Sequence, residues 1–172
     1  VGNELNVNIA GSSDISCDVD FNSAKLQITG SGDITAPNFK TCNASITGSG
    51  NIELSEASEK LKVVITGSGD FSCDRANDPQ LTVTGSGDID IKEISGEASA
   101  TLTGSGDITL GGNVHTINIK TSGTGDIYAS KLTTESASIR ADGPCDVTIG
   151  RIINGSEEKI SKTSTLKVNK RG

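Results

Sequence analysis

The chain has 172 residues, enough for one domain with a core of its own, although its apolar content of 33 % is low for a globular protein. Its formal net charge of −7 argues against binding to nucleic acid or to an anionic membrane surface. No apolar run approaches the length of a membrane span and no signal peptide is visible, so we expect a cytosolic chain or one whose signal was removed before Val1.

A short motif returns every 18 to 20 residues along the chain. In its clearest copies Gly-Ser-Gly is followed by Asp or Asn and an apolar residue, as at 30–34 and 85–89, and weaker copies lie at 11–15, 123–127 and 143–147. The acidic or amide position is occupied in turn by Asp14, Asp33, Asn51, Asp70, Asp88, Asp107, Asp126 and Asp146. A repeat this short and regular predicts a solenoid, in which each turn buries its apolar side only by stacking on the next.

Apolar and polar residues alternate on both sides of the motif, as in strands with one buried face. The residue after each Asp position is expected in one buried column: Ile34, Ile52, Phe71, Ile89, Ile108, Ile127 and Val147. Another apolar column is expected six or seven residues after the Asp position: Phe39, Ala57, Ala76, Ile94, Val114, Leu132 and Ile152. The apolar residues that precede the motif, such as Leu26 and Ile28, give a third inward column. Three inward columns predict a three-sided coil with Gly-Ser-Gly at one corner, where glycine accepts backbone angles closed to other residues. We therefore predict an all-β fold over 1–172, a single-stranded parallel, right-handed β-helix of about eight coils.

The two ends of the array differ in sequence. The repeats run from about residue 5 to 153, and the tail at 154–172 departs from them. We expect its basic, alternating stretch at 165–171 to cap the C-terminal edge. At the other end, the strand at 5–9 runs straight into the first coil without a cap, which leaves an edge available for self-association.

The tandem Thr/Ser-Gly-Ser-Gly-Asp-Ile units resemble those of the bacterial family described as putative auto-transporter adhesin, head GIN domain. The resemblance covers about residues 5–153, with departures from the motif at Ser13, Asn51, Thr124 and 144–145. It implies a parallel β-helix in a secreted or surface-anchored bacterial protein, often an outer-membrane lipoprotein, with an adhesin role and a signal removed from the mature chain. The family brings no catalytic residues, so none can be assigned through it.

The stacked carboxylates are the strongest candidates for a ligand-binding column. Those proposed as ligand-binding are Asp33, Asp70, Asp88, Asp107 and Asp126. We favour a structural interpretation, in which each Asp accepts a hydrogen bond from a turn N–H or a Ser hydroxyl. Calcium between neighbouring carboxylates is the alternative, but one Asp per turn supplies few of the six to eight oxygens that calcium takes, and Asn51 interrupts the column. We therefore predict no metal site and no cofactor.

Outward Thr and Ser residues form two more columns beside the carboxylates. Their members are Thr29, Thr47, Thr66, Thr84 and Thr103, and Ser31, Ser49, Ser68, Ser86 and Ser105. Such a ladder is similar to the flat faces of ice-binding solenoids, which is a minor alternative because a charged column lies next to it. We expect side-chain hydrogen bonds to run up the ladder instead.

The chain offers no nucleophile and base that spacing would bring together. Its one histidine, His115, is expected in an exposed loop, while Arg75 and Arg140 fall on different parts of the coil, and Tyr128 is the only outward aromatic residue. We predict a protein that is not an enzyme: a surface rod or adhesin whose partner is a host protein or a glycan. The alternative is a carbohydrate-binding or polysaccharide-processing β-helix module, which needs one coil whose outward residues break the ladders into a cleft.

Four cysteines complete the set of reactive residues, and their spacing fits no zinc motif. Cys17 and Cys73 occupy the same repeat position three coils apart, roughly 14 Å at ~4.8 Å per coil, which is too far for a disulfide. Cys17, Cys42 and Cys73 share the apolar parity of their strands. We therefore expect free thiols that pack as small apolar side chains, Cys145 included.

Overall fold

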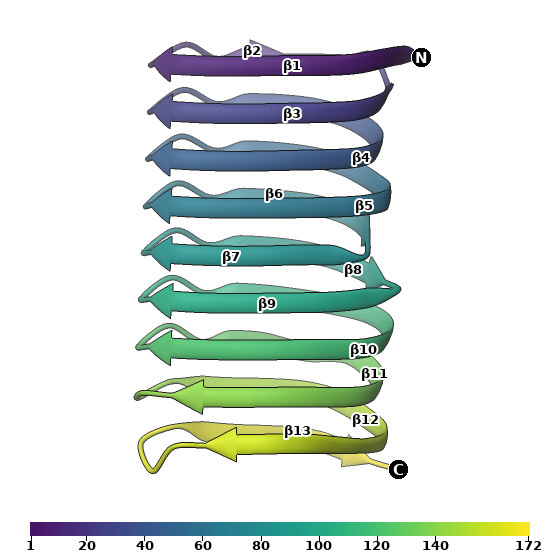
Figure 1. Ribbon diagram of the computed structural model, residues 1–172, viewed down its shortest axis with the longest axis vertical. Helices are drawn as coiled ribbons and strands as arrows, with labels where there is room; N and C mark the ends of the chain where they lie inside the picture. Colours follow the sequence, from purple (N-terminus) through teal and green to yellow (C-terminus); the bar gives the residue numbers. More distant parts are fainter.

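The computed structural model describes all residues 1–172. The chain winds as a β-solenoid of about nine turns, with its strands stacked along one axis (Figure 1). No helix long and apolar enough to cross a membrane is present. The strands are β1 (Gly2–Gly11), β2 (Ile15–Ser16), β3 (Phe21–Gly30), β4 (Ile34–Gly48), β5 (Ile52–Gly67), β6 (Phe71–Asn77), β7 (Pro79–Gly85), β8 (Ile89–Ser95), β9 (Glu97–Gly104), β10 (Ile108–Gly123), β11 (Ile127–Asp142), β12 (Asp146–Ile160) and β13 (Thr165–Arg171).

Every strand pairing is parallel and joins segments 18 to 20 residues apart. This confirms the predicted parallel β-helix, since hairpins between successive repeats would give antiparallel pairs. The solenoid has about one turn more than the repeats predict. The extra turn comes from the tail, because β13 pairs in parallel with β12 and continues the sheet.

One face of the strands lines a single core cluster of 43 buried residues. The predicted column after the Asp positions is confirmed, because each member lies opposite the next from Ile34 to Val147 and all are buried. The stack extends beyond the prediction to Ile15 at one end and Leu166 at the other. Full burial of an aliphatic side chain contributes about 1.5–3 kcal/mol, so these stacks stabilise the rod with few aromatic rings.

The other predicted column, from Phe39 to Ile152, is buried as predicted, but its members lie opposite one another only as far as Ile94. All its members are buried, and those from Phe39 to Ile94 lie opposite one another. Beyond Ile94 the partners change: Ile94 lies opposite Gly112, and Ile152 lies opposite Thr134. Bulges between the paired strands cause the change, because turns of unequal length absorb their extra residues on this side of the coil.

The Gly-Ser-Gly corner stacks with the same contacts in successive turns. Its first Gly has a positive φ, +132° at Gly85, and its carbonyl accepts two N–H groups of the next turn: Gly67 O lies 2.8 Å from Ser86 N and 3.1 Å from Gly87 N. The second Gly is not among the residues with positive φ. It is required because a Cβ on Gly87 would lie 2.1 Å from Gly69 O of the turn before. The expectation that special backbone angles explain both glycines is therefore wrong for the second.

The two ends of the solenoid differ in polarity. In the last turn Glu158 lies opposite the buried Ile139 and Arg171 lies opposite the buried Ile152, and these two charged side chains form an ion pair at 2.7 Å. Burial alone would raise the pKa of Glu158, but hydrogen bonds from Ser156 and Arg171, together with the charge of Arg171, lower it overall. At the other end, β1 pairs only with β3. The tail thus ends the columns of Ile139 and Ile152 with an ion pair, a known way of protecting a sheet edge, while the column after the Asp positions ends at Leu166.

Candidate functional site

The Asp column lies at the Gly-Ser-Gly corner, which we call the constant corner. Neighbouring members are joined by hydrogen bonds between successive turns. Asp88 Oδ1 accepts a hydrogen bond from the backbone N–H of Asp107 at 2.7 Å, and Asp107 Oδ1 accepts one from Asp126 N–H at 2.8 Å. The same bond joins every neighbouring pair from Asp14 to Asp146, with N···O distances of 2.7 to 3.0 Å. Each side chain from Asp14 to Asp126 therefore satisfies a backbone donor of the neighbouring turn.

The candidate ligand-binding residues therefore have a structural role, since their side chains hydrogen-bond one turn to the next. The structure places all five in one column: Asp33, Asp70, Asp88, Asp107 and Asp126. Asn51 performs the same task with its amide oxygen, which accepts the N–H of Asp70 at 3.0 Å. Because an amide serves as well as a carboxylate, the ladder needs an acceptor and not a charge. No group of three or more His, Cys, Asp or Glu side chains is placed to hold a metal ion.

The Thr and Ser columns are present as stacks, but hydrogen bonds do not run along them. Thr124 Oγ1 donates to Ser105 Oγ at 3.0 Å, and the hydroxyls of Thr103 and Ser122 lie 3.5 Å apart. These two bonds join the last member of each column, Thr103 and Ser105, to a residue one turn further on, and no hydrogen bond joins the side chains of two predicted members. The predicted hydroxyl ladder is therefore wrong.

The remaining sequence candidates are dispersed on the outer surface. Tyr128 is 44 % exposed and donates its hydroxyl to Asp126 Oδ2 at 2.9 Å, and this hydrogen bond to a carboxylate raises the pKa of the phenol. His115 is exposed as predicted, but it lies within β10 and not in a loop, with its Nδ1 3.1 Å from Glu135 Oε1. The surface therefore gathers none of them into a common cleft.

The two arginines singled out from the sequence form separate ion pairs. Arg75 contacts Glu56 at 2.8 Å, and Arg140 contacts Asp142 at 2.6 Å. The first pair joins neighbouring turns of β5 and β6, and the second lies within β11. As predicted, the two arginines fall on different parts of the coil.

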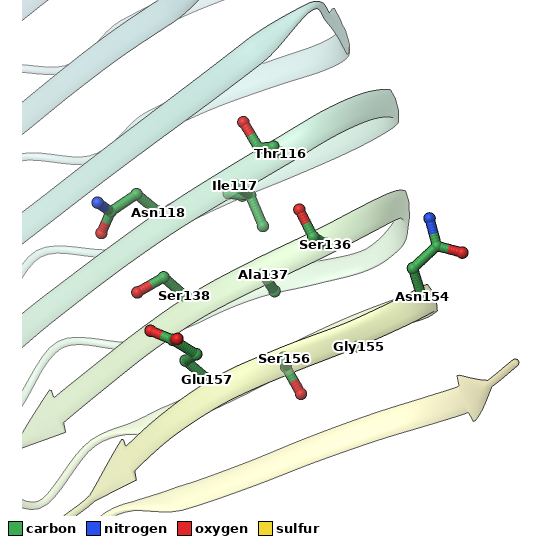
Figure 2. Close-up of a pocket in the computed structure, with 10 residues that line it drawn as sticks. All are labelled: Thr116, Ile117, Asn118, Ser136, Ala137, Ser138, Asn154, Gly155, Ser156 and Glu157. Atoms are coloured by element: carbon green, nitrogen blue, oxygen red, sulfur yellow. The ribbon is translucent and has the colours of Figure 1, made fainter.

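A hollow of about 530 Å³, which the repeat pattern did not predict, lies over β10, β11 and β12. Figure 2 shows polar side chains of these three strands around it, among them Asn118, Ser138 and Glu157. It lies beside a register shift between β11 and β12, where Ile152 to Gly155 spans one residue more than Thr134 to Ser136. The only sequence signal for this place was the end of the regular repeat near residue 154.

The cysteines are free thiols in the structure, as predicted. Cys42, Cys73 and Cys145 are buried, while Cys17 is partly exposed. Burial raises the pKa of Cys42 and of Cys73 to about 12; the Cys73 thiol adds to the effect at Cys42, and the carboxylates of Asp74 and Glu56 add to it at Cys73. A thiol with so high a pKa is a poor nucleophile at neutral pH, so these side chains serve packing.

The profile of the family described as putative auto-transporter adhesin, head GIN domain, matches the chain twice, over residues 2–74 and 62–152. The matches span the array of turns that carries the Gly-Ser-Gly corner. No curated protein and no solved structure matches the chain.

Proposed function

Because the chain belongs to the auto-transporter adhesin, head GIN domain family, whose name describes adhesin-like surface proteins, we propose that it is a non-catalytic rod presenting a binding surface outside the cell. The observation that carries the proposal is the regularity of its outward columns. Side chains on stacked, hydrogen-bonded turns are held in place before a partner arrives, which lowers the entropic cost of binding.

The distribution of titratable groups supports binding over catalysis. An enzyme of the hydrolytic classes needs an acid, a base or a nucleophile within hydrogen-bond reach in one cleft. His115 is exposed and its ring is hydrogen-bonded to Glu135 alone, and Glu157 is the one carboxylate that lines the hollow over β10–β12. Polar side chains that accept and donate hydrogen bonds without a reactive pair are suited to recognition of a host protein or a glycan.

A binding screen with the intact protein tests this proposal. Beads coated with the folded chain would be applied to a glycan array and to extracellular-matrix proteins, with heat-unfolded chain as the matched control. We expect saturable binding that is lost on unfolding. Absence of saturable binding to every surface would contradict the proposal, and so would release of new reducing ends from a polysaccharide, which indicates an enzyme.

The proposed location has its own test. We propose that the mature protein is extracellular or at the cell surface, with an outer-membrane lipid anchor as one form of attachment. Protease added to intact cells should remove the protein while a cytoplasmic marker survives. Survival of both until the cells are broken would place the protein inside.

A further inference from the structure

Three basic side chains lie next to one another on successive turns of the face formed by β10, β11 and β12. Lys120 lies opposite Arg140, and Arg140 lies opposite Lys159. All three are exposed. Neighbouring strands are about 4.8 Å apart, and like charges directly opposite one another destabilise a sheet. The protein as a whole is acidic, with a net charge of −7, so this basic column stands out from its surroundings.

The positive charge of this column is only partly balanced within the chain. Arg140 pairs with Asp142, its Nε 2.6 Å from the carboxylate. Lys120 and Lys159 have no carboxylate within 4.0 Å, unlike Lys92, which pairs with Asp74 on another side of the rod. Two stacked cations therefore remain without a partner, one on each side of Arg140.

Hydroxyl and amide groups lie beside the basic column on the same strands. Asn118, Ser138 and Glu157 form the adjacent column and line the hollow of about 530 Å³ (Figure 2). On the other side, Lys120 and Arg140 line a second hollow of about 230 Å³. The face thus joins two shallow hollows across a positively charged column.

We propose that this face binds an acidic polysaccharide, whose carboxylate or sulfate groups contact Lys120 and Lys159 and whose hydroxyls contact the Asn118 column. The inference rests on the proposed function as a surface adhesin and names its ligand class. The unpaired carboxylate of Glu157 accepts hydrogen bonds from sugar hydroxyls. A nucleic acid fits less well, because the face has no aromatic side chain on which bases stack.

The test uses the intact chain and four defined polymers in a calorimetric titration: polygalacturonate, dextran sulfate, neutral dextran and single-stranded oligo-dT. The variant K120Q/K159Q removes the two unpaired cations and keeps the Arg140–Asp142 pair. The control K25Q/K62Q removes the same charge from the same face, where Asn43 separates the two lysines. All these side chains are exposed, so both variants should melt as the parent does.

We expect at least one acidic polysaccharide to bind more tightly than neutral dextran and than oligo-dT. K120Q/K159Q should weaken that binding about tenfold, while K25Q/K62Q changes it by less than about twofold. Preference for polygalacturonate assigns carboxylate as the recognised group, and preference for dextran sulfate assigns sulfate. Equal losses in the two variants would overturn the inference, because only general charge would then be at work.

Two further results would also overturn it. Tighter binding of oligo-dT would assign the face to a nucleic acid, and binding of neutral dextran at equal strength would remove the role of the cations. If no acidic polymer binds while the binding screen still finds a partner, the ligand class is wrong and the adhesive function stands. If neither experiment finds binding, both are contradicted.

Discussion

Two sides of each turn are built in opposite ways. The constant corner, made by the Gly-Ser-Gly-Asp motif, repeats the same backbone hydrogen bonds and the same Asp-to-N–H bond in successive turns. The variable side, at about 55–60, 74–79, 92–97, 111–116, 130–136 and 150–156, has register shifts in several turns and changing side-chain contacts. It includes ion pairs that occur once each, such as Lys92 with Asp74.

The difference indicates where recognition can evolve. At the constant corner the backbone of one turn touches the backbone of the next, so a change in any turn disturbs its neighbours. On the variable side an added residue is absorbed by a bulge, and the hollow over β10–β12 lies beside such a place. We therefore expect stability to depend on the corner and binding to depend on surfaces near the variable side.

The largest expected effect comes from placing a charge in the core beside the constant corner. Ile89 is 1 % exposed and has partners in both neighbouring turns, so Ile89→Asp should abolish cooperative folding. The matched change on the variable side is Ile153→Asp, at a residue 40 % exposed, and should have little effect. Circular dichroism during heating measures both, and a normal transition for Ile89→Asp would contradict the assignment of this column to the core.

A smaller effect is expected from adding one methyl group at the corner. Gly85→Ala should cost about 3 kcal/mol or more, because it combines a positive φ of +132° with a Cβ placed 2.3 Å from Gly67 O. Gly155 on the variable side has a φ of +150° and nothing within 4 Å of its Cβ, so Gly155→Ala should cost about 1 kcal/mol. Urea denaturation measures the free energy of unfolding of both variants. Equal losses would show that the positive φ alone, without the close contact to Gly67 O, explains why glycine is needed at position 85.

The stability that the Asp ladder provides should depend on its hydrogen-bond acceptors and not on their charge. Asp88→Ala leaves the N–H of Asp107 without its acceptor and should cost about 1–2 kcal/mol. Asp88→Asn keeps an oxygen acceptor, as Asn51 does naturally, and should cost little. On the variable side, Lys92→Ala breaks an exposed ion pair and should cost less than Asp88→Ala does. A loss for Asp88→Asn as large as for Asp88→Ala would contradict the structural role.

Two buried threonines should respond to the same substitution with opposite signs. Thr121 is 3 % exposed and its hydroxyl has no hydrogen-bond partner, so Thr121→Val should stabilise the protein by about 1 kcal/mol. Thr134, beside the bulge, donates to Ser136 O at 2.7 Å, so Thr134→Val should destabilise it by about 1 kcal/mol. Urea denaturation of the pair measures both, and destabilisation by Thr121→Val would mean that its hydroxyl has a partner in solution.

The smallest expected effect is that of calcium on the constant corner. One side-chain oxygen of each ladder residue is occupied by a backbone N–H, and calcium takes six to eight oxygens. The melting temperature should therefore be the same in millimolar calcium and in a chelator, as followed by calorimetry. A rise of several degrees in calcium, abolished in Asp88→Asn, would make the ladder a metal site.

The sequence by itself determined the repeat, the parallel stacking and the column from Ile34 to Val147. It did so because each turn of a solenoid contacts only its neighbours, so that a local pattern repeated at a fixed spacing specifies most of the core. It also indicated that the Asp residues accept backbone hydrogen bonds. Which N–H they accept was decided by stacking, since the donor of each bond lies one turn further along the chain.

Only the tertiary structure decided the features that depend on contact between turns. The second Gly of each motif is required by a carbonyl of the preceding turn, which no backbone angle of its own reveals. The bulges on the variable side fix which residues become axial neighbours, so they decide that Ile94 meets Gly112 and that the hollow opens over β12. Register is a property of two paired strands together. For this reason the positions of the bulges, and of the hollow beside one of them, could not be found from the repeat alone.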